Sequence, residues 1–312
     1  MRARFQVKSQ CGPPSEPGPL RPIRRVRGWL AALLLCLAWV ASQGLSGAEA
    51  GVATNEFLLV QMCDPQFGLM DYGADKARFL EAIGQINELQ PALVIICGDL
   101  VQTAGRGTFA DFAASKAHFK VPCYCAPGNH DLGDKPTAEA LALYRECIGE
   151  DYHAVERGDC VFLLVNTQLW KSPVPGESEK HDAWFLAALE SASAKGRRIF
   201  VAGHIPVFSV TPDEPDGHDN LPLAKRRQVL DWCHHYGVVA YLAGHSHRAR
   251  AAEYLGMQIV QSETTSFNVD FHPHGFRVWH VGPTRPFAQE FVRLKRPEPA
   301  PQPSGIVPPK MK

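Results

Sequence analysis

The sequence lacks an excess of charge of either sign. Its 312 residues contain 32 Lys and Arg and 32 Asp and Glu, so the formal net charge is zero. This balance excludes a strongly basic nucleic-acid binder and a strongly acidic disordered chain, and we expect no nucleic acid partner. The apolar share of 45% is that of a folded globular protein. The length suits one large α/β domain or two ordinary ones.

The amino-terminal part lacks an apolar run long enough for an ordinary membrane span. The run from Trp29 to Ala41 has 13 residues, whereas a spanning helix needs about 20. It follows a basic cluster at residues 21–27 and precedes Ala48-Glu49-Ala50, an order typical of secretory signals. We therefore expect residues 1–50 to be a signal peptide with a basic, Pro-rich n-region, cleaved near Ala50. The mature protein would be secreted or periplasmic and would not contact a membrane, unless residues 29–41 are retained as an anchor.

Two common site signatures are also missing. Cys123 and Cys125 resemble half of a zinc site, but no second Cys pair stands at a zinc-like spacing, so we predict no structural zinc. No Gly-x-Gly-x-x-Gly follows the first predicted strand, which excludes a dinucleotide-binding domain of the Rossmann type. Seven Cys follow Ala50, and this odd number leaves at least one free thiol even outside the cytosol.

Apolar runs of strand length alternate with helix-like stripes, which predicts an α/β protein. Several strands are apolar throughout, which predicts sheets covered by helices on both faces. The Pro-rich end at 296–312 predicts a disordered tail after a folded domain at 51–295. The predicted strands are 57–63, 92–97, 121–126, 161–165, 199–202, 238–243, 257–261 and 275–281; the predicted helices are 74–90, 109–119, 137–148, 181–195 and 225–235.

Polar side chains stand directly after the apolar strands. Taken singly, Asp64 would most often cap a turn, and a lone His204 would most often be structural. Ligands in α/β proteins bind at the carboxyl ends of strands, so the ordered set predicts one common site. Two carboxylates, one amide and three imidazoles exceed a single tetrahedral site and suit two divalent ions bridged by one Asp. The set is Asp64, Asp99, Asn129, His204, His245 and His247.

These motifs resemble those of the calcineurin-like metallophosphoesterase family, and most closely the branch of calcineurin-like phosphoesterase domain-containing protein 1. The resemblance to the family rests on Asp64-Pro65-Gln66, Gly98-Asp99, Gly128-Asn129-His130-Asp131, Gly203-His204 and Gly244-His245-Ser246-His247. The resemblance to the branch rests on the stretches 64–70, 136–139 and 204–206. It implies a two-sheet β-sandwich flanked by helices, with a dimetal site at the carboxyl edge of the strands. The implied activity is hydrolysis of a phosphate ester by a hydroxide that two metal ions activate.

The resemblance also implies a role for each residue. Asp64 and His247 would hold the first ion, and Asp99 would bridge both ions. Asn129, His204 and His245 would hold the second ion. His130 would protonate the leaving alkoxide as general acid, and Asp131 would orient His130.

Gln66 departs from the family pattern, which has His at this position. An amide oxygen is a harder donor than imidazole, so Gln66 should shift the preference from zinc toward manganese, magnesium or iron. Alternatively Gln66 does not ligate and the first ion is held more weakly. The rival to an enzyme is therefore a catalytically impaired metal-binding or partner-binding protein of the same fold. The retention of His130 and Asp131 argues against that rival.

Two features stay open at this point. The acidic segment 209–223 is either a solvated surface loop or a loop that shapes substrate access. Six histidines match no motif and are expected in the surface or core: His153, His181, His234, His235, His272 and His274. The substrate, the metal identity and the oligomeric state are not fixed by the sequence.

Overall fold

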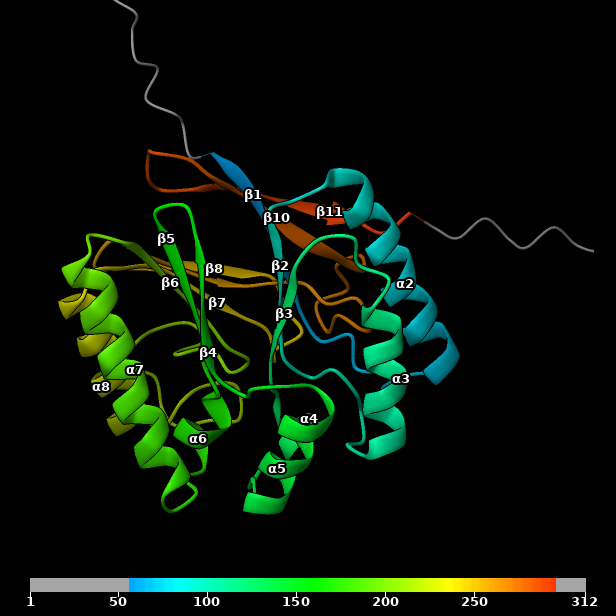
Figure 1. Cartoon of the computed structure of the whole chain (residues 1–312), viewed down its shortest axis with the longest axis horizontal. Coiled ribbons are helices and arrows are strands. Elements are labelled where there is room, and N and C mark those ends of the chain that lie inside the picture. Colours follow the sequence, from blue (N-terminus) through cyan, green and yellow to red (C-terminus); the bar gives the residue numbers. More distant parts are fainter. Residues whose placement is uncertain (1–55, 296–312) are drawn as a thin grey trace, which may run out of the picture. The chain divides into compact units, whose positions relative to one another are not determined.

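The computed structural model describes residues 56–295 as two β-sheets with helices on their outer sides (Figure 1). The predicted signal peptide at 1–50 and the predicted tail at 296–312 lie outside the described residues. The two-sheet sandwich flanked by helices is confirmed. None of the helices in residues 56–295 is both long enough and apolar enough to cross a membrane.

The first sheet has five strands in the order β11-β10-β1-β2-β3. Its strands β1, β2 and β3 are parallel, and β10 and β11 continue the sheet in antiparallel pairing. The carboxyl ends of β1, β2 and β3 therefore meet at one edge. The bounds are β1 (Phe57–Met62), β2 (Leu93–Cys97), β3 (Cys123–Ala126), β10 (Gly275–Val281) and β11 (Ala288–Arg293).

The second sheet has six strands in the order β4-β5-β6-β7-β9-β8. Its four inner strands are parallel, and the edge strands β4 and β8 are antiparallel to their neighbours. The bounds are β4 (His153–Arg157), β5 (Cys160–Leu164), β6 (Arg198–Ala202), β7 (Val238–Ala243), β8 (Arg250–Tyr254) and β9 (Met257–Gln261).

The helices lie on opposite outer sides of the sandwich (Figure 1). The first sheet is covered by α2 (Tyr72–Leu89), α3 (Arg106–Lys116) and α5 (Ala138–Cys147), and the second by α7 (Glu177–Ala194) and α8 (Leu223–His235). Two short helices, α4 (Asn129–Leu132) and α6 (Thr167–Lys171), follow β3 and β5. Thr137 caps the amino end of α5, because its hydroxyl accepts the Ala140 N–H at 3.2 Å.

The core between the two sheets corrects one prediction. Leu59 and Trp279 of the first sheet pack with Phe200 and Leu242 of the second in one buried cluster. Each sheet is thus covered by helices on one face and by the other sheet on the opposite face. An apolar strand is buried on both sides in either arrangement, so its sequence cannot tell a helix layer from a second sheet.

A buried glutamine joins the sheets just behind the strand ends. Gln61 of β1 donates to the carbonyls of Ala243 (2.9 Å) and Val260 (3.1 Å), and its Oε1 accepts the indole N–H of Trp279 (3.0 Å). These bonds fix β1 against β7 three residues before Asp64 and two residues before His245. Gln61 therefore sets the spacing between the Asp64 and His245 segments.

The sequence missed three strands, β4, β8 and β11, and all three lie at sheet edges. Most of their residues are exposed or half-buried, as in Arg250–Tyr254. Edge strands of this kind carry no continuous apolar run, so the signal that identified the inner strands is absent.

The cysteines contribute to packing in the described part of the chain. All seven Cys of residues 56–295 are free, and five of them are buried. Cys123 and Cys147 are half-buried. Among residues 56–295, neither Cys123 nor Cys125 belongs to a group of side chains that could hold a metal ion.

The buried His181 should make the stability of the fold depend on pH. It is buried beside Tyr152 and Trp170, and burial, aided by the charge of Lys225, lowers its pKa to about 3. In the unfolded chain its pKa is about 6.5. Below that value the unfolded state binds a proton that the native state does not, so stability falls as pH falls.

Between pH 7 and pH 5 we expect His181 to cost about 2 kcal/mol of unfolding free energy. Urea unfolding at both pH values would measure this loss in the natural protein and in His181→Gln, which should lack it. His235→Gln, an exposed substitution on α8, should keep the full loss. Equal losses in the natural protein and in His181→Gln would show that the ring titrates freely in the fold.

Candidate metal centre

The six residues predicted as metal ligands converge at the carboxyl ends of the strands. Asp64 follows β1, Asp99 follows β2 and Asn129 begins α4 directly after β3. His204 follows β6, and His245 and His247 follow β7, so the second sheet supplies the three imidazoles. Five of the six residues are buried, and the His247 side chain is 13% exposed. The topology thus brings together residues up to 183 positions apart, since His247 lies beside Asp64.

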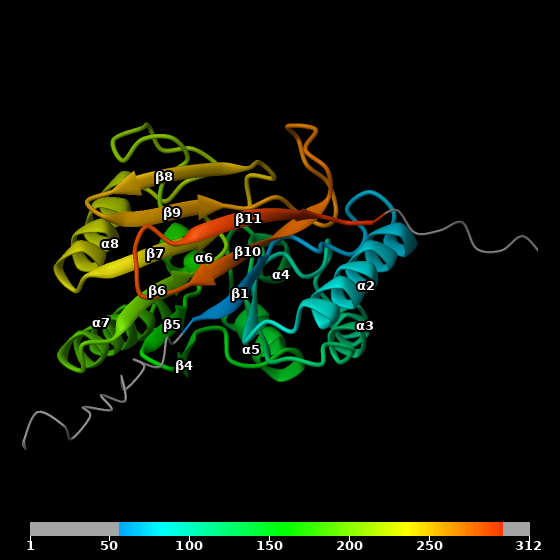
Figure 2. The same cartoon turned by 90° about the horizontal axis from the view of Figure 1, so that it is seen from above.

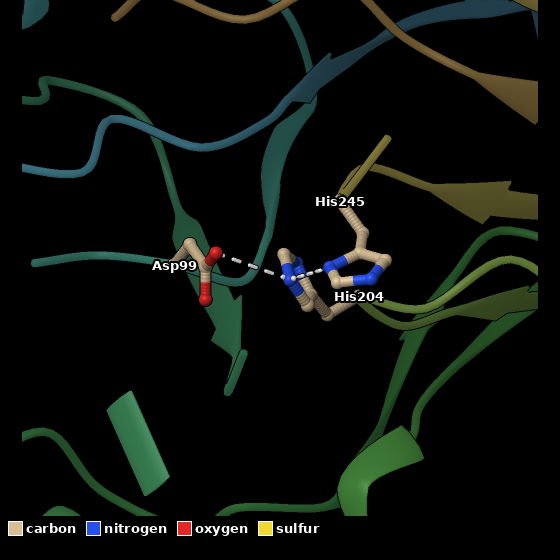
Figure 3. Close-up of side chains that lie close together, drawn as sticks. All are labelled: Asp99, His204 and His245. Atoms are coloured by element: carbon tan, nitrogen blue, oxygen red, sulfur yellow. Dashed lines mark hydrogen bonds and ion pairs between the residues drawn. The ribbon is translucent and has the colours of Figure 1, made fainter. Parts of the chain in front are cut away.

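One group of donors surrounds the His204 ring (Figure 3). Nε2 of His204 lies 3.2 Å from Oδ2 of Asp99, 3.0 Å from Nδ1 of His245 and 3.0 Å from Oδ1 of Asn129. Nδ1 of His204 donates to the Cys97 carbonyl at 2.8 Å, so Nε2 is the ring nitrogen that faces Asp99, His245 and Asn129. This is the set predicted for the second ion.

A second group consists of Asp64, Asp99 and His247, whose potential ligand atoms all lie within 4.8 Å of one another. Nε2 of His247 is 3.6 Å from Oδ1 of Asp64, and Nδ1 of His247 bonds to the Phe267 carbonyl at 2.6 Å. Asp99 belongs to both groups. A carboxylate shared by two ligand sets is the arrangement of a bridged two-metal site.

Gln66 lies at the same centre. Its side chain is buried, and its Nε2 donates to Oε1 of Gln102 at 3.0 Å. Its Oε1 is buried without a hydrogen-bond partner. An unpaired buried carbonyl oxygen is costly unless a cation or a donor satisfies it. This orphaned oxygen therefore fits a metal ligand.

The backbone of the motifs is strained. Asp64, Gln66, Asp99, His245 and His247 all have positive φ, between 41° and 68°. Non-glycine residues rarely adopt this conformation, and it persists mainly where a site requires it. It turns each side chain off the end of its strand toward the shared centre.

Glycines of the same motifs allow the loops to approach closely. A Cβ on Gly128 would lie 2.1 Å from Oδ1 of Asp99, and a Cβ on Gly244 would lie 2.4 Å from Oδ2 of Asp64. Any larger residue would push the carboxylates out of place. Gly128 and Gly244 are thus part of the site because only a residue without a side chain leaves room for the two carboxylates.

The electrostatics of the centre also fit cations. Burial alone would raise the pKa of Asp99, but the charge and hydrogen bond of His204 hold it below its usual range. Burial opposes protonation of His204 as well, yet the charge of Asp99 raises the pKa of His204 to about 10. The buried carboxylates therefore demand positive charge, which divalent ions would supply in place of a proton.

The prediction that Asp131 orients His130 is wrong. The Asp131 carboxylate turns into the fold and accepts the backbone N–H groups of Leu100 (2.9 Å) and Gly128 (2.8 Å). The His130 ring bonds instead through Nδ1 to the carbonyl of Gln102 at 3.0 Å. Adjacent residues of the short helix α4 point in different directions, so their neighbourhood in sequence did not mean contact. Asp131 fixes the two loops that carry Asp99 and Asn129.

The structure adds His218, which the sequence analysis placed only within the acidic segment 209–223. Its carbonyl accepts a hydrogen bond from Nε2 of His245 at 3.2 Å, and the two rings stack with centroids 4.6 Å apart. The His218 side chain is 70% exposed and its Nδ1 bonds to Asp219 at 3.0 Å. The segment 209–223 therefore reaches the site, which favours the access-shaping alternative.

Buried and half-buried groups hold that segment rigid. The Glu214 carboxylate accepts the N–H of Ser209 at 2.7 Å and of Val210 at 2.8 Å. Arg226 is fully buried and donates to carbonyls within the segment, and Lys171 does the same near His218. No motif could reveal this support, because it depends on contacts between distant elements.

Two hollows meet at the centre. The first, of about 270 Å³, is lined by residues of both ligand groups. The second, of about 480 Å³, lies beside it. Asn129, His130 and His218 line both. A substrate could thus place one part against the ligand residues and another part beyond the two imidazoles.

Comparison with known proteins gives concordant matches. The model of the family described as calcineurin-like phosphoesterase matches residues 71–249. The serine/threonine-protein phosphatase CPPED1 of Danio rerio is 30% identical over 263 residues, covering 76% of this chain and 84% of the relative. That of Bos taurus is 31% identical over 247 residues, covering 71% and 79%. A solved dimetal phosphatase from Danio rerio shares the fold, with a TM-score of 0.58 at 17% identity, covering 75% of this chain and 95% of that one.

Proposed function

Because the chain belongs to the calcineurin-like phosphoesterase family, we propose that two metal ions and His130 together hydrolyse a phosphate monoester at this centre. The observation that carries the proposal is the position of Asp99, which lies in both ligand groups. The substrate we propose is a phosphorylated Ser or Thr side chain, since the similar proteins of Danio rerio and Bos taurus are named serine/threonine phosphatases.

The residues present would hold the ions in two sets. Asp64, Gln66 and His247 would hold the first, Asn129, His204 and His245 the second, and Asp99 both. When bound, the ions would activate a water and supply positive charge for the phosphoryl oxygens. Backbone carbonyls keep one nitrogen of each imidazole occupied, so the other nitrogen faces the centre. Oxygen donors at the first set favour manganese, magnesium or iron over zinc.

His130 is placed to donate a proton to the leaving group of the substrate. Its backbone N–H donates to Oδ1 of Asp99 at 2.9 Å and its Nδ1 bonds to the Gln102 carbonyl, so Nε2 is the nitrogen free for a substrate. Water oxygen would bond to phosphorus as the ester P–O bond breaks. As the imidazolium, His130 carries a proton on each ring nitrogen, and Nε2 would give its proton to the departing alkoxide while Nδ1 keeps its own. The carbonyl of Gln102, rather than Asp131, accepts the Nδ1–H and orients the ring.

The proposal that Gln66 ligates predicts a selective effect on the first ion. In Gln66→Leu the amide oxygen is lost, so affinity for the weaker-bound ion should fall about tenfold to a hundredfold while the other ion stays. Isothermal titration of manganese into the metal-free protein would resolve the two sites. Gln90→Leu is the control, because Gln90 also has positive φ but caps α2 away from the centre. Unchanged affinities in Gln66→Leu would show that Gln66 does not ligate.

Metal content and hydrolysis of the purified full chain test the function directly. After loading with manganese or iron, we expect two ions per chain and metal-dependent turnover of p-nitrophenyl phosphate and of a phosphoserine peptide. Bis(p-nitrophenyl) phosphate would report any diesterase activity. Fewer than two ions and no turnover with any metal would favour the alternative of a metal-binding or partner-binding protein.

A further inference from the structure

An apolar rim borders the hollow of about 270 Å³ at the ligand residues. It consists of Leu69, Met70, Val269 and Phe271. Leu69 and Val269 line the hollow, and Met70, Val269 and Phe271 are 64%, 38% and 91% exposed. In Figure 2 the loop between β9 and β10 projects beside the segment that leads into α2. Exposed apolar side chains that gather at the mouth of a site mark a binding surface.

The first half of the rim is held by a buried carboxylate. Oδ2 of Asp75 accepts the N–H of Gly68 at 3.1 Å and of Met70 at 3.2 Å. Arg78 bonds to the same carboxylate and also donates to the Thr265 carbonyl at 3.0 Å. Arg78 therefore ties the turn that carries Met70 to the loop that carries Phe271.

The second half is held in a strained turn. Phe271 has a φ of 60°, a left-handed conformation that is rare for a bulky residue. Its N–H donates to the Asn268 carbonyl at 3.2 Å, and the Asn268 side chain bonds to Thr264 (2.8 Å) and Pro273 (3.0 Å). The fold thus maintains a conformation that exposes a phenyl ring, at a cost in both strain and hydration.

The position of the rim indicates an extended substrate. Met70 and Phe271 are not among the residues that line the hollow of about 270 Å³, so a small ester held there would not cover them. A polypeptide with a phosphorylated residue at the centre continues outward on both sides and can reach them.

The charges around the mouth disfavour an anionic lipid surface. Asp71 follows Met70 and Asp270 precedes Phe271, while Asp219 contacts His218, which also lines the hollow. Among the described residues that line the two hollows, none is Lys or Arg. Carboxylates next to each exposed apolar side chain repel anionic headgroups and suit neutral or basic residues of a peptide.

We propose that Leu69, Met70, Val269 and Phe271 dock an apolar side chain of a phosphorylated polypeptide, close in sequence to the phosphorylated Ser or Thr. This inference rests on the proposed function and specifies which polypeptides the site prefers. The preferred sequences carry a large apolar residue, with neutral or basic neighbours, within a few residues of the phosphate.

Two phosphoserine peptides of equal length test the rim, one with Leu and one with Ser in the flanking positions. The metal-loaded natural protein should prefer the Leu peptide about tenfold in kcat/KM. Met70→Gln combined with Phe271→Asn should abolish this preference, while turnover of p-nitrophenyl phosphate and metal content stay unchanged. Leu255→Asn is a matched control, because Leu255 is 64% exposed and also has positive φ (48°) in the turn between β8 and β9.

A binding measurement keeps this test separate from the proposed function. Phosphonate analogues of both peptides cannot be hydrolysed, and fluorescence anisotropy would show whether the rim variant loses the preference for Leu. If no ester is hydrolysed but the natural protein still binds the Leu analogue more tightly than the Ser analogue, the proposed function is wrong and the peptide-docking role of the rim is supported. Equal affinity of the natural protein for the Leu and Ser peptides would overturn the proposal that the rim docks a peptide. The proposal would also be overturned if the natural protein bound phosphatidylcholine–phosphatidylserine vesicles, or formed a dimer in solution, and the rim variant did not.

Discussion

Asp99→Asn should remove metal binding at both sites and lower turnover at least about 1000-fold. Asp99 contacts both ligand groups, so the loss of its charge weakens both ions at once. Asparagine keeps the shape of the side chain and an acceptor for the N–H of His130, which Oδ1 of Asp99 accepts at 2.9 Å. The effect should therefore come from the charge. Inductively coupled plasma mass spectrometry after desalting would measure the metal content, and p-nitrophenyl phosphate the turnover.

Asp231→Asn makes the same chemical change at an exposed position of α8 and should alter neither metal content nor rate. A thermal melt of the chelator-treated proteins would check that Asp99→Asn is folded, since His204 loses its buried partner. Two ions per chain with near-normal turnover in Asp99→Asn would show that this carboxylate does not bridge.

His130→Ala should lower turnover about 100- to 10,000-fold without loss of metal, because it removes the proton donor and no ligand. The loss should depend on the leaving group. p-Nitrophenolate leaves readily without a proton, whereas the alkoxide of serine does not. We therefore expect a smaller loss with p-nitrophenyl phosphate than with a phosphoserine peptide. Steady-state kinetics with both substrates at fixed manganese would measure the difference.

His235→Ala, an exposed substitution on α8, is the matched control and should leave both rates unchanged. A uniform loss with both substrates would assign His130 to substrate binding rather than proton transfer. A loss of metal would assign it to the ligand set. Unchanged turnover would remove it from the mechanism, and His218, which lines the same two hollows, would become the next residue to test.

The apolar runs predicted most of the inner strands well, because a strand buried on both faces consists of consecutive apolar residues. The predicted strand 238–243 coincides with β7, and 257–261 with β9. Helix limits were less exact: α7 begins at Glu177, four residues before the predicted start at His181. Its first turn is polar and exposed in part, so the apolar periodicity starts after the helix does.

The convergence of the predicted ligands could be inferred from the sequence, whereas the contact between the neighbours His130 and Asp131 could not. Asp64, Asp99, Asn129, His204, His245 and His247 could be identified because each directly follows a strand, and the ends of parallel strands share one edge. The predicted Asp131–His130 contact failed, since side-chain direction within a turn depends on backbone angles that sequence order does not specify. Asp131 instead binds backbone N–H groups around Gly128 and Leu100.

The sequence by itself determined the inner strands and the set of predicted metal ligands, because these depend on local patterns of residues. Only the tertiary structure decided that the sheets pack on each other, that Asp99 joins both ligand groups and that Gln66 presents an unpaired oxygen. It also brought His218 and the rim residues Met70 and Phe271 to the mouth of the site. These features arise from contacts between segments far apart in the chain, and no local pattern of residues encodes such contacts.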